Sequence, residues 1–175
     1  MGLIRSSSLD SSRPEAPCTH SSPSRYRTLL RTIDKGKLSN VAPLQLALAE
    51  AVGKREMVLP GSDLSAHALG RFYPRESGPR EVVPVESLDH LCSSGNVPIP
   101  RFIKCDVEGF PDVVLEGAKE LIRHHRPTWL IELWNDEEIG YACDPGYTAF
   151  YYRDGDIHET TRSVENIGEY FLFPR

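Results

Sequence analysis

The pattern of hydrophobic and polar positions is clearest over residues 101–133, where it predicts a strand, a helix and a second strand. An apolar strand over residues 101–106 is followed by a turn, and Pro111 suits the first turn of a helix because its missing N–H is not needed there. Apolar residues then recur on one helical face until His125, and residues 128–133 are a second apolar, β-branched run. A strand, a helix and a strand within about 35 residues build a parallel sheet with a right-handed crossover.

The N-terminal pattern is different. Residues 1–24 contain eight Ser and three Pro with little to bury, which predicts a disordered leader. Apolar positions at helical spacing predict a helix over residues 24–36, ending at Gly36. Alternating leucines then predict a strand over residues 41–48, with Pro43 near its start.

Two aromatic runs near the C-terminus, residues 147–152 and 168–173, read as strands, and residues 153–156 as a turn. No strong helical pattern lies between them, so an antiparallel pair at one edge of the parallel sheet fits best. The fold class expected from the whole pattern is therefore α/β, with parallel strands and an antiparallel C-terminal edge pair. Residues 25–175 form one domain.

Composition narrows the classes of function. The 175 residues are 39% hydrophobic with a net charge of −5, which argues against binding to a nucleic-acid backbone. No apolar run approaches the roughly 20 residues of a membrane-spanning helix, and there is no secretory signal pattern. The charge is uneven, because residues 1–80 carry 12 basic and 7 acidic side chains (net +5) and residues 81–175 carry 8 and 18 (net −10).

The four cysteines lie far apart in the sequence, without a Cys-x-x-Cys pair, at Cys18, Cys92, Cys105 and Cys143. This spacing favours reduced thiols in a cytoplasmic protein over a disulfide framework or a zinc site. Nor does the sequence contain the nucleophile elbow of hydrolases, the phosphate-binding loop of nucleotide triphosphatases or the His-Glu-x-x-His of zinc proteases.

The candidate catalytic residues lie where the two predicted parallel strands end. Lys104 and Asp106 share one face of their strand, Glu108 lies in the following turn, and Glu132 ends the second strand. Ligands of open α/β sheets bind outside the carboxyl ends of strands, so these side chains are expected to face one crevice. Nearby carboxylates repel each other, which raises the pKa of one of them and prepares it for proton transfer, whereas the neighbouring Lys104 ammonium opposes this shift. The structural alternative is that Lys104 neutralises a buried acid and Glu108 caps the next helix; an Asp-x-Glu metal clip is a more remote one.

These segments together resemble the FkbM family of methyltransferases. The resemblance covers about residues 25–175 and is carried by short motifs along the chain: Val85-Glu86-Ser87-Leu88-Asp89, Phe102-Ile103-Lys104-Cys105-Asp106-Val107-Glu108-Gly109, Val114-Leu115-Glu116-Gly117-Ala118, Arg126-Pro127 and Ile131-Glu132. Upstream, residues 40–53 resemble the family's third strand and the segment after it, and Gly146-Tyr147 with the last aromatic strand resembles its closing region.

The resemblance implies a class I, Rossmann-like fold that binds S-adenosylmethionine and moves its methyl group to an oxygen of a small molecule or sugar. By this analogy Asp106 is the base or orienting group and also contacts the cofactor. Lys104, Glu108 and Glu132 are its partners. Four consecutive residues are expected near the adenine: Ala47, Leu48, Ala49 and Glu50. No metal is implied.

The sequence departs from the family at one motif. The family opens with a strand and a glycine-rich turn, Asp-x-Gly-Ala-Asn-x-Gly, followed by a second strand whose last acid holds the ribose. None of the thirteen glycines forms a Gly-x-Gly, and the Ser-rich leader stands in that place. The resemblance thus predicts a truncated domain that lacks its first two strands. The strand over residues 101–106 would then have an exposed edge through which copies could associate.

Two functional hypotheses remain. The chain is a methyltransferase of the FkbM type with an incomplete cofactor site, or it is a non-catalytic remnant or a fragment that needs a partner chain. A metal-dependent transferase that uses Asp106 and Glu108 is a third, more remote hypothesis.

Overall fold

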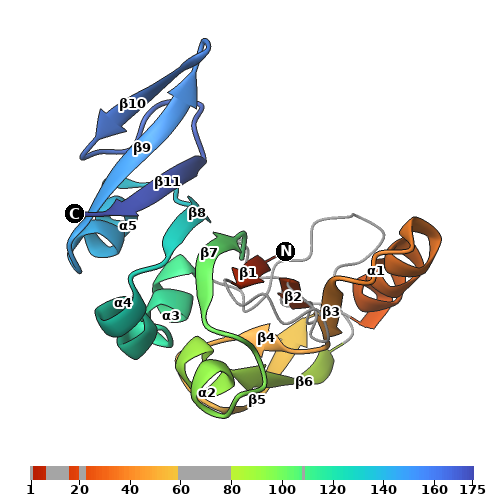
Figure 1. Ribbon diagram of the computed structural model, residues 1–175. Coiled ribbons are helices and arrows are strands. Elements are labelled where there is room, and N and C mark those ends of the chain that lie inside the picture. Colours follow the sequence, from red (N-terminus) through yellow and green to blue (C-terminus); the bar gives the residue numbers. More distant parts are fainter. Residues whose placement is uncertain (1, 7–15, 20–22, 59–79, 108) are drawn as a thin grey trace.

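The computed structural model describes residues 2–6, 16–19, 23–58, 80–107 and 109–175, which fold into a mixed α/β structure with two sheets. The larger sheet has eight strands in the order β10-β9-β11-β8-β7-β1-β2-β3, and the smaller has three in the order β4-β6-β5 (Figure 1). No helix in these residues is long and apolar enough to cross a membrane.

The central pair of the larger sheet is β7 (Pro100–Cys105) and β8 (Thr128–Glu132). The two strands are parallel, as the sequence predicts, with Ile103 beside Trp129 and Cys105 beside Ile131. These four side chains are buried on one face, where helices α3, α4 and α5 contribute to the core. Their neighbours along each strand point to the opposite face and stay partly exposed.

The single helix expected after Pro111 is two helices, α3 (Pro111–Glu116) and α4 (Lys119–His125). The break falls at Gly117, whose carbonyl accepts a hydrogen bond from Asp89 N at 2.9 Å. The Asp89 carboxylate in turn accepts bonds from Glu120 N (2.9 Å) and Leu121 N (2.8 Å), which satisfies the first turn of α4. A contact about 30 residues away in the chain therefore starts a new helix.

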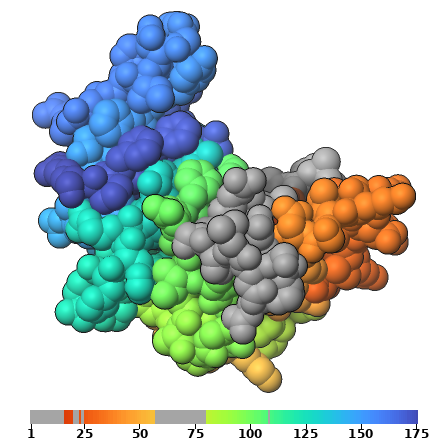
Figure 2. Space-filling view, in the orientation of Figure 1, coloured from red at the N-terminus to blue at the C-terminus, as the bar shows by residue number. Residues whose placement is uncertain are grey.

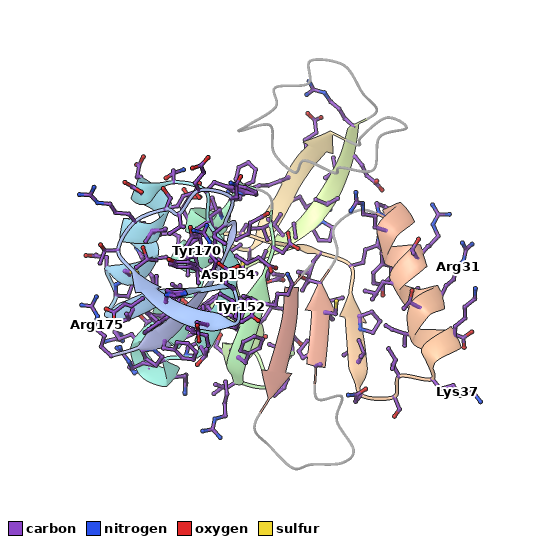
Figure 3. The ribbon with its side chains drawn as sticks, turned by 90° about the horizontal axis from the view of Figure 1, so that it is seen from above. Arg31, Lys37, Tyr152, Asp154, Tyr170 and Arg175 are labelled. Carbon is purple, nitrogen blue, oxygen red and sulfur yellow. The ribbon has the colours of Figure 1, made fainter. Side chains whose placement is uncertain are left out.

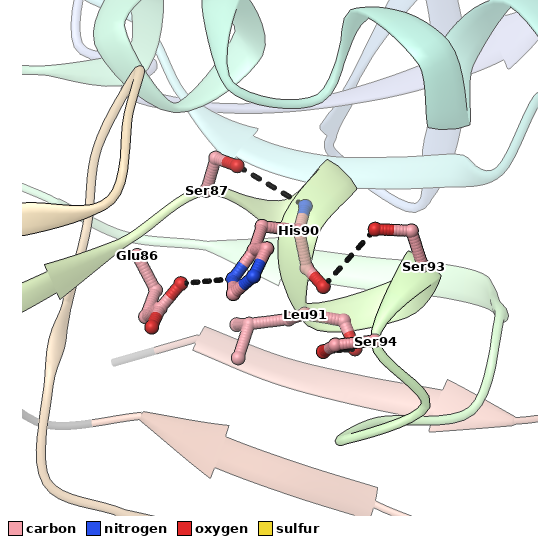
Figure 4. Close-up of polar contacts among 6 residues, drawn as sticks. All are labelled: Glu86, Ser87, His90, Leu91, Ser93 and Ser94. Atoms are coloured by element: carbon pink, nitrogen blue, oxygen red, sulfur yellow. Dashed lines mark hydrogen bonds and ion pairs between the residues drawn. The ribbon is translucent and has the colours of Figure 1, made fainter.

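Asp89 is held in place by a short capped helix, α2 (Leu88–Ser93). Ser87 precedes this helix in an extended conformation, and its hydroxyl accepts a hydrogen bond from His90 N at 3.1 Å, the usual role of a helix N-cap (Figure 4). Glu86 Oε2 lies 2.7 Å from His90 Nδ1, at hydrogen-bond distance. The helix start, and with it the direction of Asp89, is thus fixed locally.

The structure describes parts of the N-terminal range for which the sequence predicts a disordered leader. Two segments of that range are strands of the large sheet, β1 (Gly2–Ser6) and β2 (Ala16–Thr19), and the rest of it, apart from the start of α1, lies outside the described residues. β1 pairs antiparallel with β7, so the edge of β7 that was expected to be exposed is covered. Only one of the eight Ser residues of this range, Ser6, lies in these two strands, so the strands form in its less Ser-rich parts.

The helix expected from residue 24 is α1 (Pro23–Gly36), which lies beside the edge strand β3 (Val41–Leu44). Its basic side chains Arg31 and Lys35 are exposed, and Arg31 and the following Lys37 extend away from the sheet in Figure 3. The strand expected over residues 41–48 is split: β3 joins the larger sheet, and β4 (Ala47–Leu48) joins the smaller one with β6 (Arg80–Glu86) and β5 (Gly53–Val58).

The C-terminal strands confirm the expected antiparallel pairing and extend it. β9 (Tyr147–Arg153) and β11 (Glu169–Pro174) are antiparallel, and β11 is also antiparallel to β8. A third strand, β10 (Asp156–Thr160), forms the edge after a tight turn in which Asp154 and Gly155 have positive φ. Before them, α5 (Asp136–Cys143) is capped by the side chain of Asn135.

Candidate functional site

Three acidic side chains lie at the carboxyl-terminal edge of the β7–β8 pair, and we call this cluster, with Lys104, the acid edge. Cys105 pairs with Ile131, so the next residues of the two parallel strands, Asp106 and Glu132, are neighbours on the same face. Glu132 is also the cross-strand partner of Glu169 on β11. The expectation that Asp106 and Glu132 face the same side of the sheet therefore agrees with the strand register.

Lys104 links this cluster. Its ammonium donates to Glu169 Oε1 at 2.7 Å and lies 3.5 Å from Asp106 Oδ2. The Lys104 and Asp106 side chains are about one-third exposed and that of Glu169 is more exposed. The carboxylates of Asp106, Glu132 and Glu169 make the acid edge rich in acidic groups, which favours positively charged or neutral ligands.

The protonation of Lys104 reflects both of its partners. Burial by itself lowers the pKa of the ammonium, but the hydrogen bond and charge of Glu169, together with the charge of Asp106, outweigh it. The pKa of Lys104 is thus held above its ordinary value, and the side chain is a cation at neutral pH.

Sequence reasoning missed Glu169. It lies 65 residues after Lys104 and at the first position of an antiparallel strand, so no local motif connects it with Asp106. The one available signal is its position: an acid that begins an antiparallel strand next to a parallel strand lies at the edge where that parallel strand ends. Glu108, predicted to act beside Asp106, lies outside the described residues.

The four residues expected near the adenine are not gathered at the acid edge. Ala47 and Leu48 pair with β6 in the smaller sheet, and the buried Ala49 packs against the junction of α3 and α4. At that junction a Cβ on Gly117 would lie 2.1 Å from the Ala49 carbonyl oxygen. Glu50 differs from the other three because its side chain lines a cavity.

This cavity has a volume of about 680 Å³, within the usual range for a small-molecule site. It lies between the turn after β4 and the first turns of α3 and α5, and five of its lining residues are acidic: Glu50, Asp112, Glu116, Glu137 and Glu138. Glu50 pairs with Arg55 in the same wall. Asp112 lines this wall and belongs to α3, the helix that follows Asp106 in the sequence.

A tyrosine in the cavity wall is hydrogen-bonded to one of these acids. Tyr141 Oη donates to Glu116 Oε2 at 2.8 Å, and Glu116 also pairs with Lys119. Partial burial, and then the bond to and charge of Glu116, raise the pKa of Tyr141 to about 12. The bonds from Lys119 and Tyr141 lower the pKa of Glu116. Tyr141 is therefore a hydrogen-bond donor at neutral pH rather than a base.

The cysteines lie in surroundings that suppress nucleophilic chemistry. Burial raises the pKa of the Cys105 thiol to about 12, and burial together with Asp89 raises that of Cys92 to about 11. Within the described ranges, no group of three His, Cys, Asp or Glu side chains is arranged to hold a metal ion.

Comparison with known families shows to which family the chain belongs. The family model described as "Methyltransferase FkbM domain" matches residues 22–162. The chain belongs to the FkbM methyltransferase domain family. This confirms the resemblance inferred from the short motifs, and the matched range contains every candidate site residue except Glu169.

A solved structure agrees with the family. The crystal structure of methyltransferase FkbM from Methylobacillus flagellatus KT matches with a TM-score of 0.51 at 17% sequence identity. The match covers 90% of this chain and 36% of that chain, so this FkbM domain corresponds to about a third of the length of that protein. At this identity the match supports the fold alone. No curated protein matches.

Proposed function

We propose that this FkbM domain is an S-adenosylmethionine-dependent methyltransferase with a Rossmann-like class I sheet, acting on an oxygen of a small molecule or a sugar. The observation that carries the proposal is the acid edge, where Asp106, Glu132 and Glu169 meet Lys104 at the end of two parallel strands. This is the position where open α/β sheets bind their ligands.

The residues present fit the cofactor in two places. The acid edge gathers three carboxylates, which suits a sulfonium cation, and the Glu50 carboxylate in the cavity wall, which pairs with Arg55, can also accept hydrogen bonds from ribose hydroxyls. Asp106 would lie near the sulfonium and Glu50 near the nucleoside. When bound, S-adenosylmethionine supplies an electrophilic methyl group.

The protein's own part in the reaction is to orient the acceptor and to move one proton. In this proposal the Asp106 carboxylate accepts the hydroxyl proton of the acceptor as its oxygen attacks. Lys104 holds the Asp106 and Glu169 carboxylates in place through its ammonium. Glu132 is half-buried and next to Asp106 in the strand register. Its carboxylate adds negative charge near the acceptor oxygen, which gains positive charge as it takes the methyl group.

The alternative, a non-catalytic domain or one that acts with a partner chain, is favoured by one observation. In the family the first strand, which carries the glycine-rich turn, pairs with the strand of Asp106. Here the neighbour of β7 on that side is β1, which is antiparallel and carries no such turn. A partner would then have to supply the missing contacts to the methionine part of the cofactor.

The expected partners follow from the same chemistry. An acidic chain with a negatively charged site should bind a small hydroxylated acceptor, and neither nucleic acid nor a membrane surface. Four separated cysteines favour a cytoplasmic location. Association between copies through a strand edge would involve β3 or β10, the outer strands of the larger sheet.

Calorimetric titration with S-adenosylmethionine tests the proposal. A dissociation constant below about 100 μM, equivalent to about 5.5 kcal/mol, requires an organised pocket. Methyl transfer is then measured as release of S-adenosylhomocysteine with a panel of simple alcohols, phenols and monosaccharides. The Asp106→Asn variant should bind the cofactor but lose at least about tenfold in rate, because the base is gone. An active Asp106→Asn protein would refute the proposed base, and a protein that does not bind the cofactor would favour the alternative.

A further inference from the structure

The Lys104 side chain crosses a strand to reach its main partner. In the sheet order, β8 lies between β7, which carries Lys104, and β11, which carries Glu169. Lys104 is level with Leu130 of β8, and Leu130 is level with Phe171 of β11, two positions beyond Glu169. The Lys104 ammonium therefore passes over β8 and ends 2.7 Å from Glu169 Oε1.

The two carboxylates near this ammonium are not equivalent. Glu169 accepts the short, charge-assisted bond, and Asp106 lies at 3.5 Å, the outer limit of a hydrogen bond. The difference matters for proton transfer, since a cation in close contact stabilises a carboxylate and makes it a weaker proton acceptor. Asp106 is therefore a better proton acceptor when the Lys104 ammonium is bound mainly by Glu169.

We propose that Glu169 is a positioning residue of the acid edge, which holds the Lys104 ammonium over β8 and thereby keeps it from close pairing with Asp106. This inference rests on the proposed function, because it matters only if Asp106 accepts the proton of the acceptor. Glu169 itself touches neither the acceptor nor the methyl group. Its effect passes through Lys104.

A purely structural ion pair is the competing explanation. Glu169 is 59% exposed, and exposed ion pairs contribute little to stability, so the bond does little to hold β7 and β11 together. A structural pair predicts that its loss alters only the stability of the protein. A positioning residue predicts changed chemistry at Lys104 and a changed pH dependence of the reaction.

The first measurement is the reactivity of the Lys104 amine toward acetic anhydride in the folded protein, followed by mass spectrometry. In Glu169→Gln the ammonium keeps one carboxylate partner, Asp106, instead of two, so its pKa falls and its acetylation near pH 8 should be roughly threefold faster. Glu169→Asp keeps the charge and should stay close to wild type. Lys119, which pairs with Glu116, is an internal reference, and Glu165→Gln removes an exposed acid from the same loop-and-strand segment.

The second measurement is the pH dependence of methyl transfer with the best acceptor of the panel. In Glu169→Gln, Lys104 moves onto Asp106, so kcat should fall roughly fivefold with KM unchanged and the acid limb of the rate profile should move to lower pH. Glu169→Asp should recover most of the rate, and Glu165→Gln should match wild type.

The outcomes separate the inference from the proposed function. A wild-type protein that neither binds S-adenosylmethionine nor transfers a methyl group refutes the proposed function, and the positioning role falls with it. An active wild-type enzyme in which Glu169→Gln leaves Lys104 acetylation or the pH profile unchanged overturns the inference alone. Faster acetylation together with the displaced profile supports it.

Discussion

The two ends of the eight-stranded sheet are stabilised in different ways. In the C-terminal region, residues 88–175, one face of β8, β9 and β11 is buried, and Trp129, Ile131 and Leu172 are fully inaccessible. The core cluster of the described residues draws all its members from positions 88–172. In the N-terminal region, β1–β3 with α1, β2 is buried, β3 is half-buried and β1 pairs with β7, but none of the buried residues of β2 belongs to that core cluster. Figure 2 shows α1 at one side of the molecule and the C-terminal strands at the other.

This difference relates to function. The acid edge is built on the region with the large core, where strand register is fixed by buried side chains on one face. The N-terminal strands adjoin the same sheet without contributing to that core cluster. The placement of Asp106 and Glu132 therefore rests mainly on the C-terminal core.

The largest effect should come from removing core volume in the C-terminal region. Leu172→Ala leaves a cavity where the side chain is fully buried and should lower the free energy of unfolding by about 3 kcal/mol. Leu29 on α1 is also buried but lies outside the core cluster, and Leu29→Ala should cost about 2 kcal/mol. Urea denaturation of both variants measures the difference. Equal losses would mean that the two regions are equally packed.

The second prediction concerns the contact that joins the smaller sheet to the helices. Gly117→Ala would place a Cβ 2.1 Å from the Ala49 carbonyl oxygen, and backbone on both sides must move. We expect a loss of about 2.5 kcal/mol by urea denaturation. Gly140→Ala is the matched control, since no atom lies within 4 Å of that Cβ and the α5 position gains helix propensity of up to about 1 kcal/mol. A well-tolerated Gly117→Ala would contradict the close approach.

How much the sequence could predict depends on the same division. The strands β7, β8, β9 and β11 and helix α1 were correct because each rests on a local periodic pattern. The break between α3 and α4 was missed because it is decided by Asp89, whose carboxylate caps α4 from a distant part of the chain. The same applies to Glu169, which meets Lys104 only through the order of strands in the sheet.

The N-terminal strands show a different limit of sequence reasoning. Residues 1–24 have few apolar side chains, and composition alone predicted no order there. Every residue except proline has a backbone N–H donor and a C=O acceptor, so strand pairing needs no particular side chains. The pairing of β1 with the edge of β7 can therefore not be predicted from composition. Asp106 and Glu132, by contrast, were correctly expected at one edge because parallel strands end together.

The third prediction tests Asp89 as the element that divides the long apolar helix. Asp89→Ala removes the acceptor of two backbone bonds at the start of α4 and should cost about 1.5 kcal/mol in urea denaturation. Asp156→Ala, at an exposed position of β10, should change stability by less than about 0.5 kcal/mol. If the Asp89 variant is as stable as this control, Gly117 alone must break the helix.

The smallest effect is a pH dependence in the cavity wall between the helices and the smaller sheet. The pKa of Tyr141 is raised to about 12 from 10.0, first by burial and then by the bond to and charge of Glu116, so the folded protein holds the phenol proton more tightly than the unfolded chain. The stabilisation is therefore fully present below about pH 10 and is lost as the pH rises toward 12. Tyr141→Phe cannot titrate, so the difference in urea midpoint between wild type and variant should shrink between about pH 9 and pH 11.5. The other groups that titrate at high pH are common to both proteins and cancel. A difference that stays constant over this range would show that Glu116 does not restrain the Tyr141 proton, and that the cavity wall is more open than the 2.8 Å bond implies.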